Sequence, residues 1–311
     1  MPDSTGVILL YHGVTDTLSN GIENFSGKHM NAQEFERQIR FISQKCTPMS
    51  LRTIAKLLES GHLLPPRSVA VTFDDTFKNV RTLALPILIK YNVPATFFIS
   101  TGFVGNGRRF WVDKVEHILN LCKHKFIRLD FEKKSLLFHL TNSKEKIIAV
   151  RAAKSIFKRL KPAYRDQVID SLIKATGITD NGDSVSNYTN MDWEDVRMLD
   201  RPPLFEVGGH TVNHEILSYL TMEEVENEIR GCIEELELQL GHLIDLFSYP
   251  EGQIEHYNES VIKQLKVYGI KICPTAIVGT NRIGENPFHL KRIMAGFMGI
   301  SFPFQSYLSE S

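Results

Sequence analysis

Residues 69–75 read Val-Ala-Val-Thr-Phe-Asp-Asp, an apolar run that ends in two adjacent carboxylates. Three other apolar runs also end in polar side chains: Val7 to Leu10 at Tyr11-His12, Leu204 to Val207 at His210-x-x-x-His214, and Leu246-Phe247 at Ser248-Tyr249-Pro250-Glu251-Gly252. Strands that stop where polar side chains begin bring those side chains to one face of a sheet or barrel. Parallel α/β enzymes hold their active sites at that face. The pattern predicts a metal-dependent hydrolase.

Helical patterns alternate with the strands through most of the chain. Helices are expected at 31–46, with Asn31 and Glu34 as a capping box, at 221–240, with Thr221 and Glu224 as a capping box, and at 258–268. Gly241 and Gly269 follow the last two and favour their ends there. Short buried strands are expected at 95–100, 269–273 and 289–293. Strand and helix in alternation predict a parallel α/β architecture.

The segment from Gly107 to Asn190 interrupts this alternation. It carries helical patterns at 113–124, 143–160 and 163–176 and one strand candidate at 126–131. We predict a mainly helical insertion at 107–189, with 1–106 and 190–311 forming the main domain. The segment holds 17 Lys and Arg against 9 Asp and Glu, so it is basic although the whole chain is neutral. It forms either solvated helix faces or a basic rim that attracts an anionic substrate or carrier, such as a phosphorylated lipid or a nucleotide sugar.

Composition sets the outer limits. With 311 residues, of which 42% are hydrophobic, the chain can bury a sizeable core as one large or two smaller domains. Lys plus Arg and Asp plus Glu each total 36, which by itself predicts no nucleic-acid or membrane partner. No run approaches the roughly 18 apolar residues of a membrane helix, and no basic region precedes the first apolar stretch, so we expect a cytoplasmic protein. The four cysteines form no CxxC pair and are expected to be reduced.

His210 and His214 are the strongest candidates for metal ligands. Three intervening residues bring two imidazoles together on a helical turn or in a tight loop, although such a pair also arises by chance. Asp74 and Asp75 follow a buried strand, where carboxylates are costly unless a cation satisfies them; the alternative is a turn or a helix cap. One Asp and two His make a three-ligand site with an open position, as in catalytic rather than structural metal sites.

These motifs resemble those of the polysaccharide deacetylases, the NodB-homology group or carbohydrate esterase family 4. The resemblance rests on residues 71–75 (VTFDD), 210–214 (HTVNH) and 247–252 (FSYPEG), and also on 10–14 (LYHGV), 94–98 (PATFF) and 290–293 (LKRI). It spans most of residues 7–106 and 190–295, in the family's order. It implies a distorted (β/α)7 TIM-like barrel and a divalent-metal hydrolase that removes N-acetyl groups from amino sugars.

The resemblance also implies roles for single residues. Asp75, His210 and His214 would bind the metal, usually zinc, and Asp74 would deprotonate the attacking water. The backbone N–H of Glu251 would stabilise the oxyanion, with Tyr249 and Arg292 also expected at the substrate. His12 would protonate the leaving amine, unless it is only a structural histidine at a strand end.

Three positions depart from the family pattern. Thr76 replaces a Gly, so that the turn must adopt negative φ or accept strain. Ser248 replaces an Arg that steadies the base, a role that Arg292 could take over. Glu251 replaces an aromatic residue and brings negative charge to a site that should stabilise negative charge.

Three functions are compatible with these residues. The first is an N-deacetylase acting on an N-acetylated sugar of a bacterial surface polysaccharide or lipopolysaccharide precursor. The second is a metal-dependent hydrolase of a small amide or imide. The third is a glycan-binding homologue whose turnover is impaired by the three departures.

Overall fold

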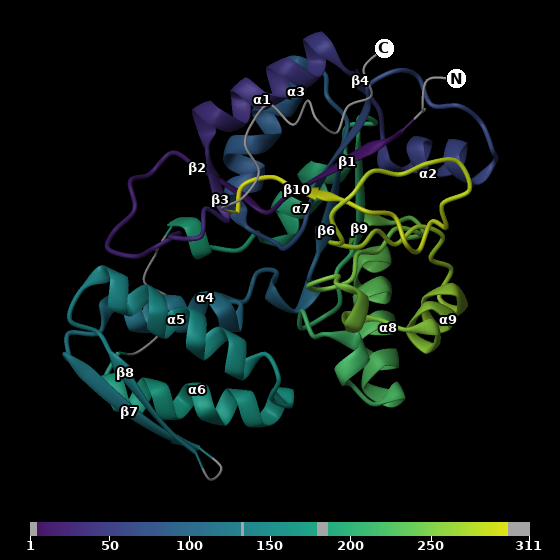
Figure 1. The fold of residues 1–311 in the computed structure, drawn as a ribbon. Coiled ribbons are helices and arrows are strands. Elements are labelled where there is room, and N and C mark those ends of the chain that lie inside the picture. Colours follow the sequence, from purple (N-terminus) through teal and green to yellow (C-terminus); the bar gives the residue numbers. More distant parts are fainter. Residues whose placement is uncertain (1–4, 132–133, 179–185, 298–311) are drawn as a thin grey trace. The chain divides into compact units, whose positions relative to one another are not determined.

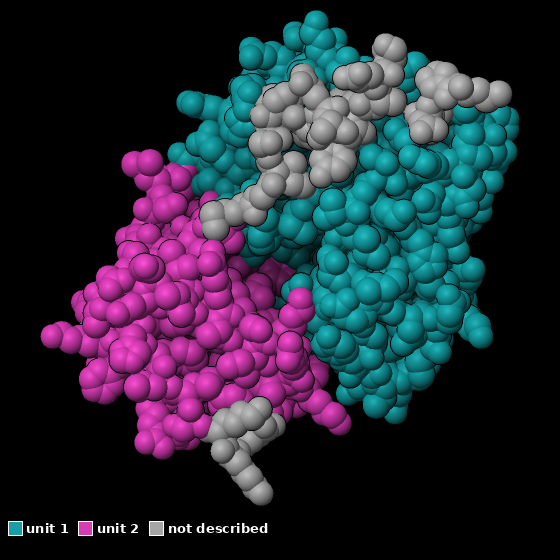
Figure 2. All heavy atoms as spheres, in the orientation of Figure 1, with its two compact units in different colours: residues 1–16, 27–106, 189–311 teal, residues 17–26, 107–188 magenta. Residues whose placement is uncertain are grey.

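The computed structural model describes residues 5–131, 134–178 and 186–297 and divides into two compact units (Figures 1 and 2). Unit 1 comprises residues 1–16, 27–106 and 189–311, and unit 2 comprises residues 17–26 and 107–188. Residues 17–26 were predicted to lie in the main domain. They belong to unit 2 because the Asn120 side chain accepts a hydrogen bond from Ile22 N (2.8 Å) and donates one to Asn20 O (2.8 Å).

Unit 1 is built on a parallel sheet. Its strands run in the order β10 (Ile293–Met294), β1 (Val7–Tyr11), β5 (Ser68–Phe73), β6 (Ala95–Ile99) and β9 (Phe205–Gly209), and β4 (Thr47–Pro48) pairs with the start of β5. The short strands β2 (Gly13–Thr15) and β3 (His29–Asn31) form a separate parallel pair. Every residue of β1, β5 and β6 is buried, as expected of strands covered on both faces.

The sheet continues beyond β9 toward a barrel. Phe247 bridges Gly209 and Ile272 bridges Leu246, both in parallel, so the described residues contain seven parallel segments in succession. Hydrogen bonds from Cys273 N to Pro287 O and from Thr275 N to Leu290 O then link the last segment to the chain that leads into β10. This is the predicted distorted (β/α)7 arrangement. The segments at 269–273 and 289–293 are shorter as strands than predicted.

Helices surround the strands of unit 1 (Figure 1). They are α1 (Ala32–Lys45), α2 (Leu51–Glu59), α3 (Leu85–Tyr91), α7 (Trp193–Asp200), α8 (Met222–Leu240) and α9 (Glu259–Val267). The predicted capping box of α8 is present, with Thr221 and Glu224 binding each other's backbone N–H, and Gly241 ends the helix at φ 78°. Asn31 caps α1 as predicted, but the Glu34 carboxylate accepts hydrogen bonds from Arg37 and Gln38.

Unit 2 has a core of its own. Helices α4 (Trp111–Leu121), α5 (Ser143–Phe157) and α6 (Pro162–Thr176) pack with an antiparallel hairpin, β7 (Phe126–Phe131) and β8 (Lys134–His139). Strand β8 was not predicted. Alternating burial in β7 places Ile127, Leu129 and Phe131 in the core.

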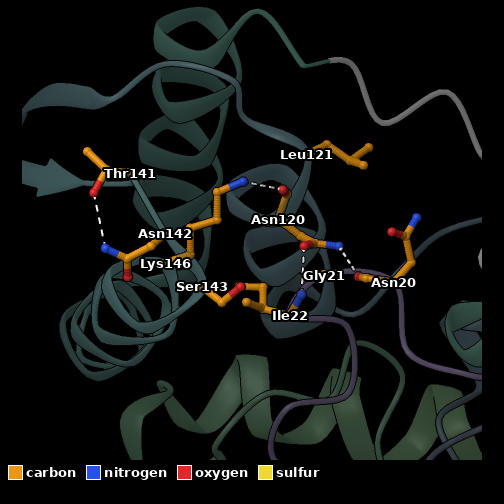
Figure 3. Close-up of a pocket in the computed structure, with 9 residues that line it drawn as sticks. All are labelled: Asn20, Gly21, Ile22, Asn120, Leu121, Thr141, Asn142, Ser143 and Lys146. Carbon is orange, nitrogen blue, oxygen red and sulfur yellow. Dashed lines mark hydrogen bonds between the residues drawn. The ribbon is translucent and has the colours of Figure 1, made fainter.

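A polar cavity of about 260 Å³ lies within unit 2 beside the start of α5 (Figure 3). Lys146 lines this cavity and donates hydrogen bonds to the backbone oxygens of Asn120 (2.6 Å) and Cys122 (2.9 Å). The lysine therefore satisfies carbonyl groups at the end of α4, where a helix has no internal donors. None of the described helices is long and apolar enough to span a membrane.

Candidate metal and catalytic site

The candidate residues follow the carboxyl ends of neighbouring parallel segments. Backbone hydrogen bonds continue just past the strand ends, from Asp74 N to Tyr11 O (3.0 Å), from His210 N to Ile99 O (2.9 Å) and from Ser248 N to Gly209 O (2.9 Å). These bonds hold the loops after β1, β5 and β9 and the segment 246–247 at one level. Four distant parts of the sequence thereby contribute to one site.

Asp75, His210 and His214 come together at this level. The Nε2 atom of His214 lies 3.3 Å from Oδ1 of Asp75, and Nε2 of His210 lies 3.9 Å from the same oxygen. One ligand atom from each residue lies within 4.8 Å of the others. The two histidines lie in a loop rather than on a helical turn. Of the helical turn and the tight loop that the spacing allowed, the structure has the loop.

The chemistry of this donor set fits a divalent metal of the zinc type. Nδ1 of His210 lies 2.8 Å from the Ser248 carbonyl oxygen, which can only accept, so Nδ1 carries the proton and Nε2 is left with its lone pair. Burial lowers the pKa of His210, which favours the neutral imidazole that a metal requires. Two imidazoles and one carboxylate suit zinc better than magnesium or calcium, which prefer oxygen ligands.

Asp74 is held by a buried arginine. The Arg292 guanidinium, fully shielded from solvent, donates to both carboxylate oxygens of Asp74 at 2.7 Å each. It also donates to Ser248 Oγ (2.8 Å) and to Thr275 O (2.6 Å). Burial is the largest single influence on the pKa of Asp74 and raises it, but the charge and hydrogen bonds of Arg292, together with the nearby His210 and His12, outweigh burial and the pKa falls to about 2. Asp74 is therefore ionised at neutral pH.

Arg292 supplies the cation beside Asp74 that the family pattern would place at position 248, where this chain has a serine. The Ser248 hydroxyl lies 2.8 Å from the guanidinium and 3.3 Å from Asp74 Oδ2. A serine leaves room for an arginine from another strand to reach the carboxylate. The contacts of Arg292 with Asp74 agree with the prediction that it replaces the missing arginine. A contact of Arg292 with substrate stays a prediction.

His12 lies close enough to this group for the charges of Asp74 and Arg292 to affect its pKa. Burial is the larger influence and lowers the pKa to about 3, so that the imidazole is neutral at neutral pH. Its Nδ1 atom is buried and has no hydrogen-bond partner among the described residues, and the ring of Phe297 stands edge-on to it with centroids 5.0 Å apart. These surroundings leave a ring nitrogen available for a proton.

The segment 249–252 contains two predicted site residues in different surroundings. Tyr249 is buried, stacks on Tyr257 at 4.2 Å between ring centroids, and directs its hydroxyl to Phe288 O (3.3 Å). This packing disfavours a substrate contact by its side chain. Glu251 is partly exposed and has φ 61°. Its oxyanion role stays a prediction.

Unfavourable backbone conformations gather in the site loops. Of the described non-glycine residues with positive φ, four lie here: Asp75 (72°), Thr211 (63°), His214 (56°) and Glu251 (61°). Thr76 is not among them, so its φ is not positive and its replacement of glycine brings no strain of this kind. Left-handed residues of this kind cost about 1–3 kcal/mol each and persist only where their surroundings enforce them.

Glu228 was not singled out in the sequence. It lies on α8, and its carboxylate accepts hydrogen bonds from Asn213 N (2.7 Å) and Asn213 Nδ2 (2.7 Å), inside the histidine loop. A signal was available, because Glu228 occupies the apolar stripe of the helix between Val225 and Cys232. A charged residue in a buried stripe needs a partner.

Comparison with known proteins gives consistent results. The family model for polysaccharide deacetylases matches residues 63–125 and 168–273, together more than half of the chain. A poly-beta-1,6-N-acetyl-D-glucosamine N-deacetylase of Staphylococcus epidermidis is 32% identical over 112 residues, which are 33% of this chain and 38% of that protein. The chain thus spans well under half the length of this curated relative.

Two solved structures share the fold over nearly the whole chain. The deacetylase PplD of Streptococcus pyogenes, solved in complex with acetate, has a TM-score of 0.64 at 16% identity and covers 99% of this chain and 100% of its own. IcaB from Ammonifex degensii has a TM-score of 0.60 at 18% identity, with 94% and 93% coverage. At these identities the likeness establishes the fold alone.

Proposed function

The chain belongs to the polysaccharide deacetylase family, and from that premise we propose that it is a metal-dependent N-deacetylase of an N-acetylated polysaccharide. One observation carries the proposal. A three-ligand set of Asp75, His210 and His214 lies beside an ionised carboxylate, Asp74, at the carboxyl ends of the parallel strands. A metal paired with a base is one of the arrangements by which enzymes hydrolyse an amide.

The metal would be held by Asp75 Oδ1 and by Nε2 of the two histidines. When bound, such a metal lowers the pKa of a water molecule and polarises a carbonyl group. Asp74 Oδ2, 3.9 Å from His210 Nε2, lies next to this position and accepts the proton of the attacking water. Arg292 and Ser248 fix the direction of the Asp74 carboxylate during this transfer.

His12 is proposed as the group that protonates the leaving amine. Its pKa of about 3 makes it neutral before the reaction. Negative charge that develops on a nearby tetrahedral intermediate raises the pKa of His12. The imidazole then takes up, directly or through water, the proton that Asp74 removed from the attacking water and passes it to the amine nitrogen as the C–N bond breaks. The backbone N–H of Glu251 is proposed as a donor to the same oxyanion.

The relatives support a substrate class to test. The Staphylococcus epidermidis protein is named for poly-beta-1,6-N-acetyl-D-glucosamine, which supports an N-acetylglucosamine polymer as the first substrate to test. A lipopolysaccharide precursor, a cytoplasmic location, zinc as the native metal and an anionic carrier at the basic unit 2 stay predictions.

The decisive experiment measures metal content and acetate release for the wild type, Asp74→Asn and His214→Ala. The wild type should bind about one metal per chain and release acetate from N-acetylglucosamine oligomers. Asp74→Asn should keep the metal and lose most of the turnover, since the amide cannot accept the proton. His214→Ala should lose both metal and turnover.

Other outcomes point to other functions. Metal binding with acetate release only from a small amide or imide would replace the polysaccharide assignment. Metal binding without turnover, together with oligomer binding, would favour the impaired glycan-binding protein. Normal turnover in Asp74→Asn would remove Asp74 as the base.

A further inference from the structure

The loop that carries His210 and His214 is irregular and is fixed at several points. Thr101 N donates to Thr211 O (3.2 Å) and Gly102 N donates to Val212 O (2.9 Å), which anchors the first half of the loop to the chain after β6. The approach is close, since a Cβ atom on Gly102 would lie 2.6 Å from Val212 O. These contacts hold Thr211 and Val212.

The second half of the loop is bound by α8. Glu228 accepts from both the backbone N–H and the side-chain amide of Asn213, each at 2.7 Å, through its two separate carboxylate oxygens. Hydrogen bonds to a charged acceptor are stronger than bonds between neutral groups. Asn213 immediately precedes His214, whose φ of 56° needs support from its surroundings.

We propose that Glu228 is a positioning residue for the metal site, which holds His214 in its ligating conformation by clamping Asn213. This inference rests on the proposed metal-dependent function, although the clamp itself can be tested without metal. Glu228 is buried, and burial raises its pKa while the Asn213 hydrogen bonds oppose that rise. Burying a carboxylate has a desolvation cost. The hydrogen bonds of Glu228 offset that cost by fixing one asparagine of the loop that carries the metal ligands, which indicates that the conformation of the loop matters.

The alternative is that Glu228 only secures the packing of α8. Helix α8 buries Val225, Ile229, Cys232, Ile233 and Leu236 against the barrel, so its attachment does not depend on one carboxylate. A packing role predicts a general loss of stability when Glu228 is replaced. A positioning role predicts a change confined to the histidine loop and to metal affinity.

The test compares Glu228→Ala with Glu228→Gln and with Glu234→Ala, an exposed glutamate on the same helix. Two quantities are measured: the metal dissociation constant by competition with a chelator, and amide hydrogen exchange of the 210–215 region in metal-free protein. Loss of a partner that orients a metal ligand typically weakens metal binding about 10–100-fold. Glu228→Ala should weaken binding by that factor and speed exchange in this loop while the barrel strands keep their protection.

The two control variants should behave differently. Glu228→Gln keeps an oxygen for Asn213 N–H and an amide that can pair with the Asn213 side chain, so it should recover most of the affinity. Glu234→Ala should match the wild type. Glu228→Ala binding metal as tightly as Glu234→Ala, or exchanging faster throughout the barrel, would overturn the proposal.

A pair of substitutions that moves the negative charge from residue 228 to residue 213 provides the test if Glu228→Ala does not fold. Asn213→Asp places a second carboxylate against that of Glu228, and their repulsion should weaken metal binding. Adding Glu228→Gln to this variant supplies an amide N–H that can donate to Asp at position 213, so metal affinity should recover. Failure of the second change to recover any affinity would count against the clamp. If the wild type binds no metal, the proposed function fails, and loop exchange in the metal-free variants still decides whether the clamp exists.

Discussion

Replacing Arg292 by methionine should destabilise unit 1 strongly and in a pH-dependent way. Methionine replaces only the aliphatic part of the arginine side chain, and it leaves the buried Asp74 carboxylate without its two 2.7 Å hydrogen bonds and without a counter-charge. Removing one partner of a buried ion pair typically costs about 3–5 kcal/mol. The pair is therefore expected to matter far more than an ion pair at the surface.

The pKa of Asp74 gives part of this magnitude. It lies near 2 in the folded protein, against an ordinary value of 3.8, so ionised Asp74 contributes about 2 kcal/mol of stability at neutral pH. That contribution is present above about pH 4 and is lost as the pH falls toward 2. In Arg292→Met burial is opposed only by the nearby histidines, and we expect it to raise the pKa of Asp74 above 3.8, which adds a desolvation penalty at neutral pH. The lost stabilisation of ionised Asp74 and the added desolvation penalty together account for a loss of about 3–5 kcal/mol.

The assay is urea unfolding of Arg292→Met at several pH values from 7 to 3 with a chelator present. A Trp111→Phe background leaves Trp193 on α7 as a fluorescence reporter for unit 1. Arg40→Met, an exposed arginine on α1, is the matched control and should change stability by less than about 0.5 kcal/mol. The loss in Arg292→Met should shrink as the pH falls below 4. A loss under about 1 kcal/mol at pH 7, or an equal loss at pH 3, would refute this reasoning.

Three further changes have defined outcomes. His12→Ala should lower acetate release while elemental analysis finds the metal content unchanged; an unaltered rate and pH profile would mean that the acid lies elsewhere. Gly102→Ala should destabilise unit 1 by about 1–3 kcal/mol in urea unfolding, because the new methyl group meets the Val212 carbonyl at 2.6 Å, and wild-type stability would show that the loop yields freely. Thr221→Ala should cost about 1 kcal/mol by loss of the α8 cap, and a stability change near zero would mean that Glu224 or solvent replaces it.

Local sequence patterns identified the main elements of unit 1 because each pattern has a local cause. Apolar runs of five or six residues gave β1, β5 and β6, and capping residues with a terminal glycine bounded α8. The segments at 269–273 and 289–293 were predicted as strands but are mostly irregular: Lys271 N and Ile272 N both donate to Asp245 O, and Arg292 N donates to Ile277 O, instead of forming a regular ladder. Strand β8 escaped prediction because its inward face is set by pairing with β7.

The sequence by itself determined the chemical content of the site and its order along the chain. Asp74, Asp75, His210 and His214 could be chosen because polar groups at the ends of buried strands share one edge of a parallel sheet. Only the tertiary structure decided how these groups are held. Arg292 reaches Asp74 across 218 residues, and Glu228 binds the histidine loop from a neighbouring helix. The sequence offered Arg292 as a candidate cation and left Glu228 as a charged residue in an apolar stripe, but it could not fix their partners, because these side chains meet only after the barrel has formed.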